Sequence, residues 1–178
     1  MRFLLPLVLA AAPGLAFAAG GAGDGHAPKP TNTTKTCKGV KVWSEKKNRC
    51  VRPKNSSLDS GTLYGAVREL AYAGRYQDAQ GVLLAMPDQK DDGVLTYWGF
   101  THRKLGNLEL ANAFYQEAID RNPNNILARS YMAQGFVVEG RMDEAVAQWR
   151  EITARGGKGT WAETSLREAI RTGETQNY

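Results

Sequence analysis

The chain has 178 residues, of which 42% are hydrophobic and 23% are charged. This length and composition fit one globular domain, and they disfavour both a wholly disordered chain and a protein with several membrane spans. The formal net charge of +5 would point to an anionic partner if it were spread evenly. It is concentrated in one short segment, as described below.

Residues 1–18 have the three-part layout of a secretory signal peptide. Arg2 gives a positive start, residues 3–12 are almost wholly apolar, and Ala16 and Ala18 supply a small-residue cleavage site. We expect cleavage after Ala18 and a periplasmic or secreted protein with no membrane span in the mature chain. An uncleaved anchor is the alternative, but a span needs about 20 apolar residues and Pro13 interrupts this run.

Residues 19–36 are rich in glycine, proline and threonine and show no apolar periodicity. Such a segment buries too little apolar surface to offset the entropy lost on ordering, so we expect a flexible leader. His26 lies within it and is expected to be solvated.

Residues 37–54, CKGVKVWSEKKNRCVRPK, form a small unit that we call the cassette. The alternation around Val40 and Val42 and the polar turn after Trp43 predict two short strands. Cys37 and Cys50 enclose a short loop, and in an exported protein the expectation is a disulfide. Such a loop would stabilise by roughly 3 kcal/mol. We expect no metal site, because two cysteines and two distant histidines do not supply the usual ligand spacing.

The cassette also carries most of the excess positive charge. It has seven basic residues against Glu45, a net of +6, whereas residues 60–178 have 13 basic and 15 acidic residues, a net of −2. The basic residues are Lys38, Lys41, Lys46, Lys47, Arg49, Arg52 and Lys54.

Residues 60–172 show helical apolar patterning with an internal repeat. Three segments align on the evenly spaced Gly74, Gly106 and Gly140, and each has an alanine five residues later. A glycine at this place permits the positive φ of a tight turn between two helices. Thr160 and Glu163 form a predicted capping box that starts a final helix, with Leu166, Ala169 and Ile170 facing inward. The expected fold is all-α: a short α-solenoid of three helical hairpins and a capping helix, preceded by the disulfide-closed β-hairpin.

The second segment, LTYWGFTHRKLGNLELANAFYQEAIDRNP, resembles the tetratricopeptide repeat, whose period is about 34 residues. Gly99, Gly106, Ala111, Tyr115 and Ala118 fall at that family's spacing, followed by Pro123. The third segment is similar but has Gly157 where proline is usual, and the first is two residues short. Small residues at Gly99 and Ala111 would let the paired helices approach closely, with Tyr115 filling the space between units.

This resemblance implies a binding groove lined by the first helix of each unit. The residues carried over as partner contacts are Tyr64, Arg68, Tyr72, Phe100, Arg103, Lys104, Gln134 and Val137. Aromatic and arginine side chains often anchor interfaces, and the basic ones favour a carboxylate-bearing partner. The alternative for each is packing against neighbouring helices. The resemblance therefore predicts an exported adaptor that binds a protein segment, most simply within a bacterial envelope complex.

Two other function classes compete with this one. The cassette could hold an anionic or carbohydrate polymer of the cell envelope, since basic groups surround Trp43. Nucleic acid would also suit such a patch, but export disfavours it. We expect no enzymatic activity and no cofactor, because His26 lies in the leader and His102 occupies a place where the repeat family has a core residue.

Overall fold

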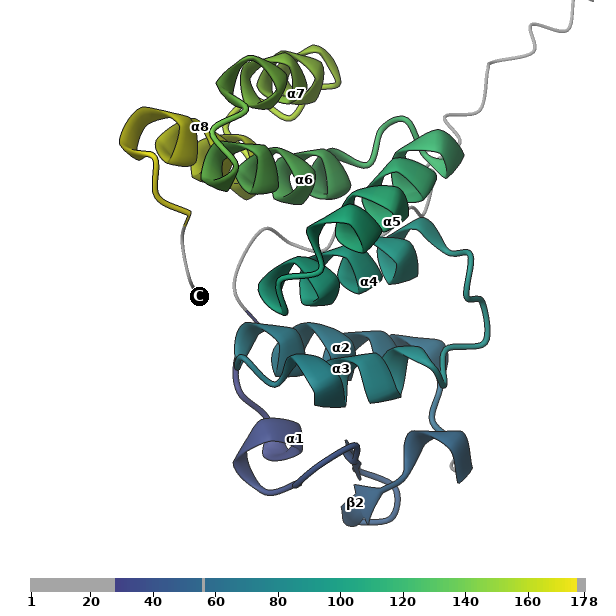
Figure 1. Cartoon of the computed structure of the whole chain (residues 1–178). Helices are drawn as coiled ribbons and strands as arrows, with labels where there is room; N and C mark the ends of the chain where they lie inside the picture. The colour runs from purple at the N-terminus through teal and green to yellow at the C-terminus, as the bar shows by residue number, and fades with distance from the viewer. Residues whose placement is uncertain (1–27, 56, 176–178) are drawn as a thin grey trace, which may run out of the picture.

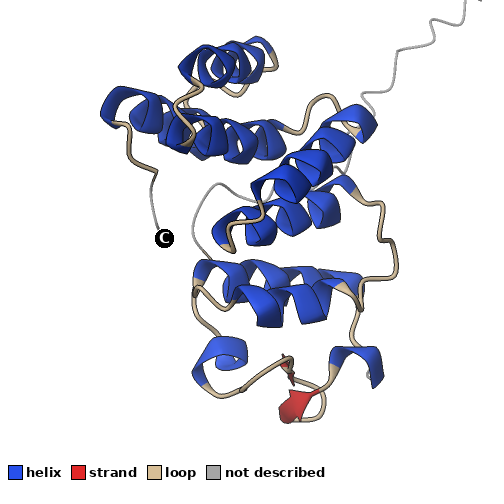
Figure 2. Cartoon of the chain, in the orientation of Figure 1, coloured by secondary structure: helices blue, strands red, loops and turns tan. Residues whose placement is uncertain are grey.

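The chain folds as three helical hairpins stacked in sequence order, followed by one further helix (Figures 1 and 2). The structure is a computed structural model that describes residues 28–55 and 57–175. The predicted signal peptide lies outside these residues. The predicted fold, all-α with a small β-hairpin, is confirmed. The hairpins are α2 (Ser60–Tyr72) with α3 (Tyr76–Leu83), α4 (Asp92–Lys104) with α5 (Leu108–Arg121), and α6 (Ile126–Val138) with α7 (Met142–Ala154), and α8 (Trp161–Thr172) closes the stack.

Local sequence signals explain where these helices begin and end. The glycines used to align the repeats all adopt left-handed backbone: φ is 74° at Gly74, 85° at Gly106 and 75° at Gly140. Glycine suits these turns because it has no Cβ, whereas other residues adopt this conformation at a cost. At the opposite ends, Asp59 and Asp91 accept hydrogen bonds from first-turn N–H groups of α2 and α4, which satisfies donors that a helix leaves unpaired.

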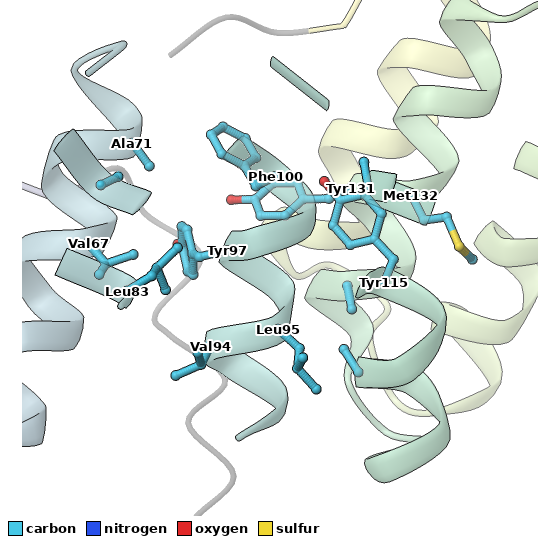
Figure 3. Close-up of a cluster of buried hydrophobic side chains, with 14 of the residues drawn as sticks. Val67, Ala71, Leu83, Val94, Leu95, Tyr97, Phe100, Tyr115, Tyr131 and Met132 are labelled. Atoms are coloured by element: carbon cyan, nitrogen blue, oxygen red, sulfur yellow. The ribbon is translucent and has the colours of Figure 1, made fainter. Parts of the chain in front are cut away.

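Close packing within a hairpin depends on the small residues of the repeat. A Cβ added at Gly99 of α4 would lie 2.6 Å from the Tyr115 ring of α5, so only glycine fits beside this tyrosine. Tyr115 is completely buried. Figure 3 shows the core running from Val67 on α2 through Tyr97 on α4 to Tyr131 on α6. The contact with Gly99 lies within the second hairpin, between α4 and α5, and the place of Tyr115 between units stays a prediction.

The cassette contains the predicted hairpin and the predicted disulfide. Strand β1 (Val42–Ser44) pairs antiparallel with β2 (Arg49–Val51), with Trp43 opposite Cys50. Cys37 and Cys50 are bonded, with an S–S distance of 2.02 Å. A short 3-10 turn, η1 (Pro53–Asn55), follows β2.

The structure differs from the sequence expectation just before the cassette. We expected residues 19–36 to be a flexible leader, but Asn32–Lys35 form a single helical turn, α1. Thr31 caps this turn by accepting from the Thr33 N–H. The turn packs against α2, so order begins several residues before Cys37.

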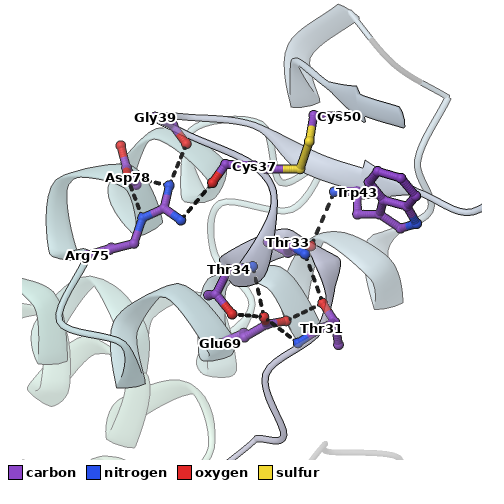
Figure 4. Close-up of a disulfide and its surroundings, with 10 residues drawn as sticks. All are labelled: Thr31, Thr33, Thr34, Cys37, Gly39, Trp43, Cys50, Glu69, Arg75 and Asp78. Atoms are coloured by element: carbon purple, nitrogen blue, oxygen red, sulfur yellow. Dashed lines mark hydrogen bonds and ion pairs between the residues drawn. A yellow bond between two sulfur atoms is a disulfide. The ribbon is translucent and has the colours of Figure 1, made fainter. Parts of the chain in front are cut away.

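The cassette is docked onto the first hairpin by polar contacts that are distant in sequence (Figure 4). Glu69 of α2 is 5% exposed and accepts hydrogen bonds from the backbone N–H and the hydroxyl of both Thr31 and Thr34. Arg75 donates to the carbonyl oxygens of Cys37 and Gly39, each at 3.0 Å, and pairs with Asp78 at 2.7 Å. Sequence analysis placed the cassette beside the helical domain; the structure makes it the cover of the domain's first end.

The opposite end is covered by α8, which packs against α6 and α7. Leu166 and Ala169 are fully buried, as the inward-facing pattern predicted. Thr160 caps the helix, accepting from the Glu163 N–H. Glu163 in turn accepts a hydrogen bond of 2.9 Å from the Trp149 indole N–H of α7.

Within residues 28–55 and 57–175, none of the helices is both long enough and apolar enough to cross a membrane.

Candidate functional site

Aromatic rings connect the first helices of successive hairpins. Tyr72 of α2 stacks on Phe100 of α4, with ring centroids 6.2 Å apart, and Phe100 contacts Tyr131 of α6 at 4.7 Å. Tyr131 meets Trp161 of α8 edge-on at 5.8 Å. The hydroxyl oxygens of Tyr72 and Tyr131 are 2.9 Å apart. We call these four residues the aromatic row, because together they cross all three hairpins and reach the last helix.

Basic side chains lie along this row. The Arg103 guanidinium and the Lys104 ammonium group are each 5.7 Å from the centre of the Phe100 ring, a distance at which cations are attracted to an aromatic face. Arg68 of α2 lies among the side chains of Tyr64, Tyr72 and Tyr97. Two of these cations are adjacent in sequence at the end of α4, so positive charge is concentrated beside Phe100.

Five of the eight predicted partner contacts are partly exposed at this row. They are Tyr64, Arg68, Tyr72, Arg103 and Lys104. The other three are buried: Phe100 is 2% exposed, Gln134 is 1% exposed and Val137 is 6% exposed. In this structure Phe100 contributes its ring to the row from beneath, and Gln134 and Val137 pack inside the domain.

The burial of Gln134 has a clear cause. The side-chain amide of Gln134 donates to the hydroxyl oxygens of Ser130 and of Ser165 on α8, both at 3.3 Å. The Ser130 hydroxyl donates to the Ala162 carbonyl oxygen at 2.7 Å. The helix that closes the stack thus occupies the face of α6 that the repeat resemblance assigned to a partner.

Three aromatic residues of this region were not identified as candidate contacts from the sequence: Tyr131 and Trp161 of the aromatic row, and Tyr97, which packs against the row. A signal was present, because Tyr131 follows Tyr97 by one full repeat and Tyr64 precedes Tyr97 by almost the same interval. Their rings also meet in space, at 5.6 Å for Tyr64 with Tyr97 and 6.3 Å for Tyr97 with Tyr131. A tyrosine therefore recurs at this position of each repeat, and Tyr97 and Tyr131 are buried beneath the partly exposed side chains.

Burial changes the protonation chemistry here. The pKa of Lys104 falls to about 8, because burial disfavours its charged form and the neighbouring Arg103 charge adds repulsion. Burial raises the pKa of Tyr64 and of Tyr72, so both phenols stay neutral hydrogen-bonding groups at neutral pH. A carboxylate placed near Lys104 would favour the charged ammonium group.

His102 faces away from this chemistry. Its ring lies nearly parallel to those of Trp98 and Phe114, with centroid distances of 5.8 and 5.5 Å, and these two rings are themselves 5.8 Å apart. Burial lowers the pKa of His102. The imidazole is held as a flat packing element between α4 and α5. This is the half-buried position expected for it from the sequence.

The cassette presents a second charged surface. Its seven basic residues are all exposed, and among the residues that the structure describes none of the seven forms an ion pair. Many arginines of the helical domain, in contrast, pair with a carboxylate: Arg75, Arg121, Arg141, Arg155, Arg167 and Arg171. The unneutralised charge of the described chain is therefore concentrated at the first end of the stack.

Comparison with known proteins gives little further guidance. No protein-family profile and no solved structure matches the chain. A stretch of 107 residues is 29% identical to the phagocyte signaling-impaired protein of Drosophila pseudoobscura pseudoobscura, and it covers 58% of this chain but 11% of that protein. So small a share of a much longer protein does not carry that protein's role over to this chain.

Proposed function

We propose that this protein is an exported adaptor that binds an acidic segment of a partner protein along the aromatic row. The observation that carries the proposal is the continuous series of rings from Tyr72 to Trp161, with Arg103 and Lys104 placed over the Phe100 ring. Phe100 and Tyr131 are buried and lie between the partly exposed Tyr72 and Trp161. The two outer rings supply rigid contact area at low entropic cost, and arginine pairs with carboxylates through two hydrogen bonds. The resemblance to tetratricopeptide repeats, whose first helices bind extended segments, supports the same face.

The binding proposal is tested with a labelled peptide in which glutamates alternate with leucines, and with its glutamine counterpart. We expect the full chain to bind the acidic peptide and not the neutral one. The double substitution Arg103→Gln and Lys104→Gln should weaken binding by about tenfold, because two charge-assisted contacts are removed.

A matched control removes the same amount of charge elsewhere. Arg150 and Lys158 are exposed, and in the described part of the chain neither has an ion pair. Arg150→Gln with Lys158→Gln should leave the affinity unchanged. Equal weakening by both double variants would mean that only net charge matters, which would contradict binding at the row.

Export is part of this proposal and has its own test. When the full chain is expressed with an intact secretion system, the protein recovered outside the cytoplasm should begin at Ala19, as read by N-terminal sequencing. Recovery of a chain that still begins at Met1 would contradict cleavage of residues 1–18.

A second candidate function is supported by the charge on the cassette. Seven exposed basic side chains without ion pairs in the described chain would attract an anionic envelope polymer, with affinity that falls as salt rises. Co-sedimentation with insoluble polygalacturonate and with neutral cellulose tests this candidate. Retention on polygalacturonate that disappears at high salt is expected; equal retention on both polymers would contradict an electrostatic mechanism.

A further inference from the structure

A hollow of about 280 Å³ lies where the cassette meets the start of α2. On the cassette side it is lined by Trp43 and by the turn that carries Glu45, Lys46 and Lys47; on the helix side it is lined by residues including Asp59. Figure 4 shows Trp43 on the opposite side of the disulfide from the Arg75 contacts. The hollow is therefore separate from the contacts that dock the cassette. Its volume lies just below the range for pockets of drug-sized ligands, so it suits a small group such as a single ring.

Trp43 gives the hollow a rigid aromatic wall. The indole N–H of Trp43 is buried, and within the described chain it has no hydrogen-bond partner. The great majority of buried donors are satisfied, since an unpaired one costs about 1–3 kcal/mol. Trp43 lies opposite Cys50 in the hairpin, so the disulfide-closed hairpin fixes the position of this ring. Because the N–H itself is buried, the part of Trp43 that lines the hollow offers a ligand ring an aromatic surface rather than a hydrogen bond.

The other lining groups supply both donors and acceptors. Lys46 and Lys47 bring ammonium groups, and Asp59 and Glu45 bring carboxylates. Hydrogen bonds from the Thr62 N–H and hydroxyl, each 2.8 Å, hold the Asp59 carboxylate in place and lower its pKa. A simple anion such as phosphate would be repelled by the two carboxylates. A polyhydroxylated ring can use them, because its hydroxyl groups donate as well as accept.

We propose that this hollow binds a single ring of an acidic saccharide, with one face of the ring on the Trp43 indole and its carboxylate toward Lys46 and Lys47. The sugar hydroxyls would donate to Asp59 and Glu45, which line the same hollow. The proposal rests on the second candidate function, for which it names a specific subsite. It differs from that candidate because it requires a defined site as well as positive charge.

The experiment uses the isotope-labelled full chain, glucuronic acid as the probe, and glucose and phosphate as comparisons. Nuclear magnetic resonance resolves the four tryptophan indole N–H signals, and Trp43→Phe identifies the one that belongs to Trp43. Glucuronic acid should shift the Trp43 signal in a saturable way and leave the other three in place. Glucose should bind at least about fivefold more weakly than glucuronic acid, and phosphate should not shift the Trp43 signal.

Two double variants with the same charge change separate a site from general attraction. Lys46→Gln with Lys47→Gln should weaken glucuronic acid binding by about fivefold or more, since both amines line the hollow. Lys38→Gln with Lys41→Gln removes equal charge from the same cassette but away from the lining, and should leave the affinity unchanged.

The outcomes are distinguishable. If the Trp43 signal does not move, or if both double variants weaken binding equally, the subsite proposal is wrong. If polygalacturonate binding persists in either case, the second candidate function stands without a subsite. If the chain binds neither glucuronic acid nor polygalacturonate, both are wrong. A shift with phosphate as large as with glucuronic acid would also contradict a saccharide site.

Discussion

The two ends of the helical stack are covered in chemically different ways. At the first end, the cassette has only two three-residue strands and is held by a disulfide and by the Arg75 contacts to its backbone carbonyls. The turn α1 before it is held by the four hydrogen bonds to Glu69. At the last end, a 12-residue helix buries Leu166 and Ala169 and adds a few hydrogen bonds. The first cover depends on covalent and polar contacts, and the second depends mainly on apolar burial.

The reason lies in how much apolar surface each cover can bury. In the cassette, the buried hydrophobic residues are Cys37 and Val42, and an isolated two-stranded hairpin is at best marginally stable. An amphipathic helix brings a full apolar stripe to its neighbours. A small polar element can serve as an end cover when cross-links and directional hydrogen bonds replace burial, and its surface then stays available for charge.

The largest expected effect is at the helical end. Leu166→Ala removes a fully buried side chain between α8 and its neighbours, and should lower the free energy of unfolding by about 3 kcal/mol. Urea denaturation followed by circular dichroism measures this loss. Arg171→Ala, on the exposed face of the same helix, is the control and should leave the unfolding midpoint nearly unchanged. Equal effects would contradict the importance of apolar burial at this end.

Removal of the disulfide should cause a loss of stability of similar size, but one confined to the cassette at the first end. Cys37→Ser with Cys50→Ser should destabilise the cassette by roughly 3 kcal/mol, because the reduced chain gains loop entropy when it unfolds. Hydrogen exchange should accelerate over residues 37–54 and stay slow in α6 and α8. Faster exchange throughout the helices would show instead that the stack needs this cover to fold.

A smaller effect tests the polar contacts themselves. Glu69→Ala leaves the N–H groups and hydroxyls of Thr31 and Thr34 without their acceptor and should cost about 2 kcal/mol, measured by hydrogen exchange of residues 31–36. Glu69→Gln is the matched variant, because its amide oxygen still accepts and its amide group can donate to the Thr31 hydroxyl. It should lose about half as much. If the two variants behave alike, docking requires the charge of Glu69 as well as its shape.

The smallest effect concerns the row between the two ends. Because the pKa of Lys104 is about 8, it is mostly charged at pH 7 and mostly neutral at pH 9, and a bound carboxylate raises this pKa. Binding of the acidic peptide should therefore weaken by about threefold between pH 7 and pH 9, because Lys104 supplies one of the two charge-assisted contacts. Lys104→Arg keeps its charge over this range and should flatten the profile. Parallel profiles for the two proteins would show that Lys104 does not contact the peptide.

Much of the fold could be predicted because its signals are local. Gly74, Gly106 and Gly140 mark the turns, and a two-residue deficit in the first segment matches the short α3, Tyr76–Leu83. The partner contacts were harder to predict. The resemblance assigned the same face of the first helix in each hairpin to a partner. On α4 this face carries Lys104, which is partly exposed, whereas on α6 it carries Gln134, which α8 covers. Position in a repeat identifies the face of a helix, but it does not tell whether another element lies on that face.

The sequence by itself determined the helical hairpins, their glycine turns and the Cys37–Cys50 bond, since each depends on residues close together in the chain and on the periodicity of the α-helix. Only the tertiary structure decided how the ends are covered and which side chains form the aromatic row. Glu69 meets Thr31 across 38 residues, and Tyr72 meets Tyr131 across 59. Such pairings depend on how whole hairpins stack, and no local spacing encodes that.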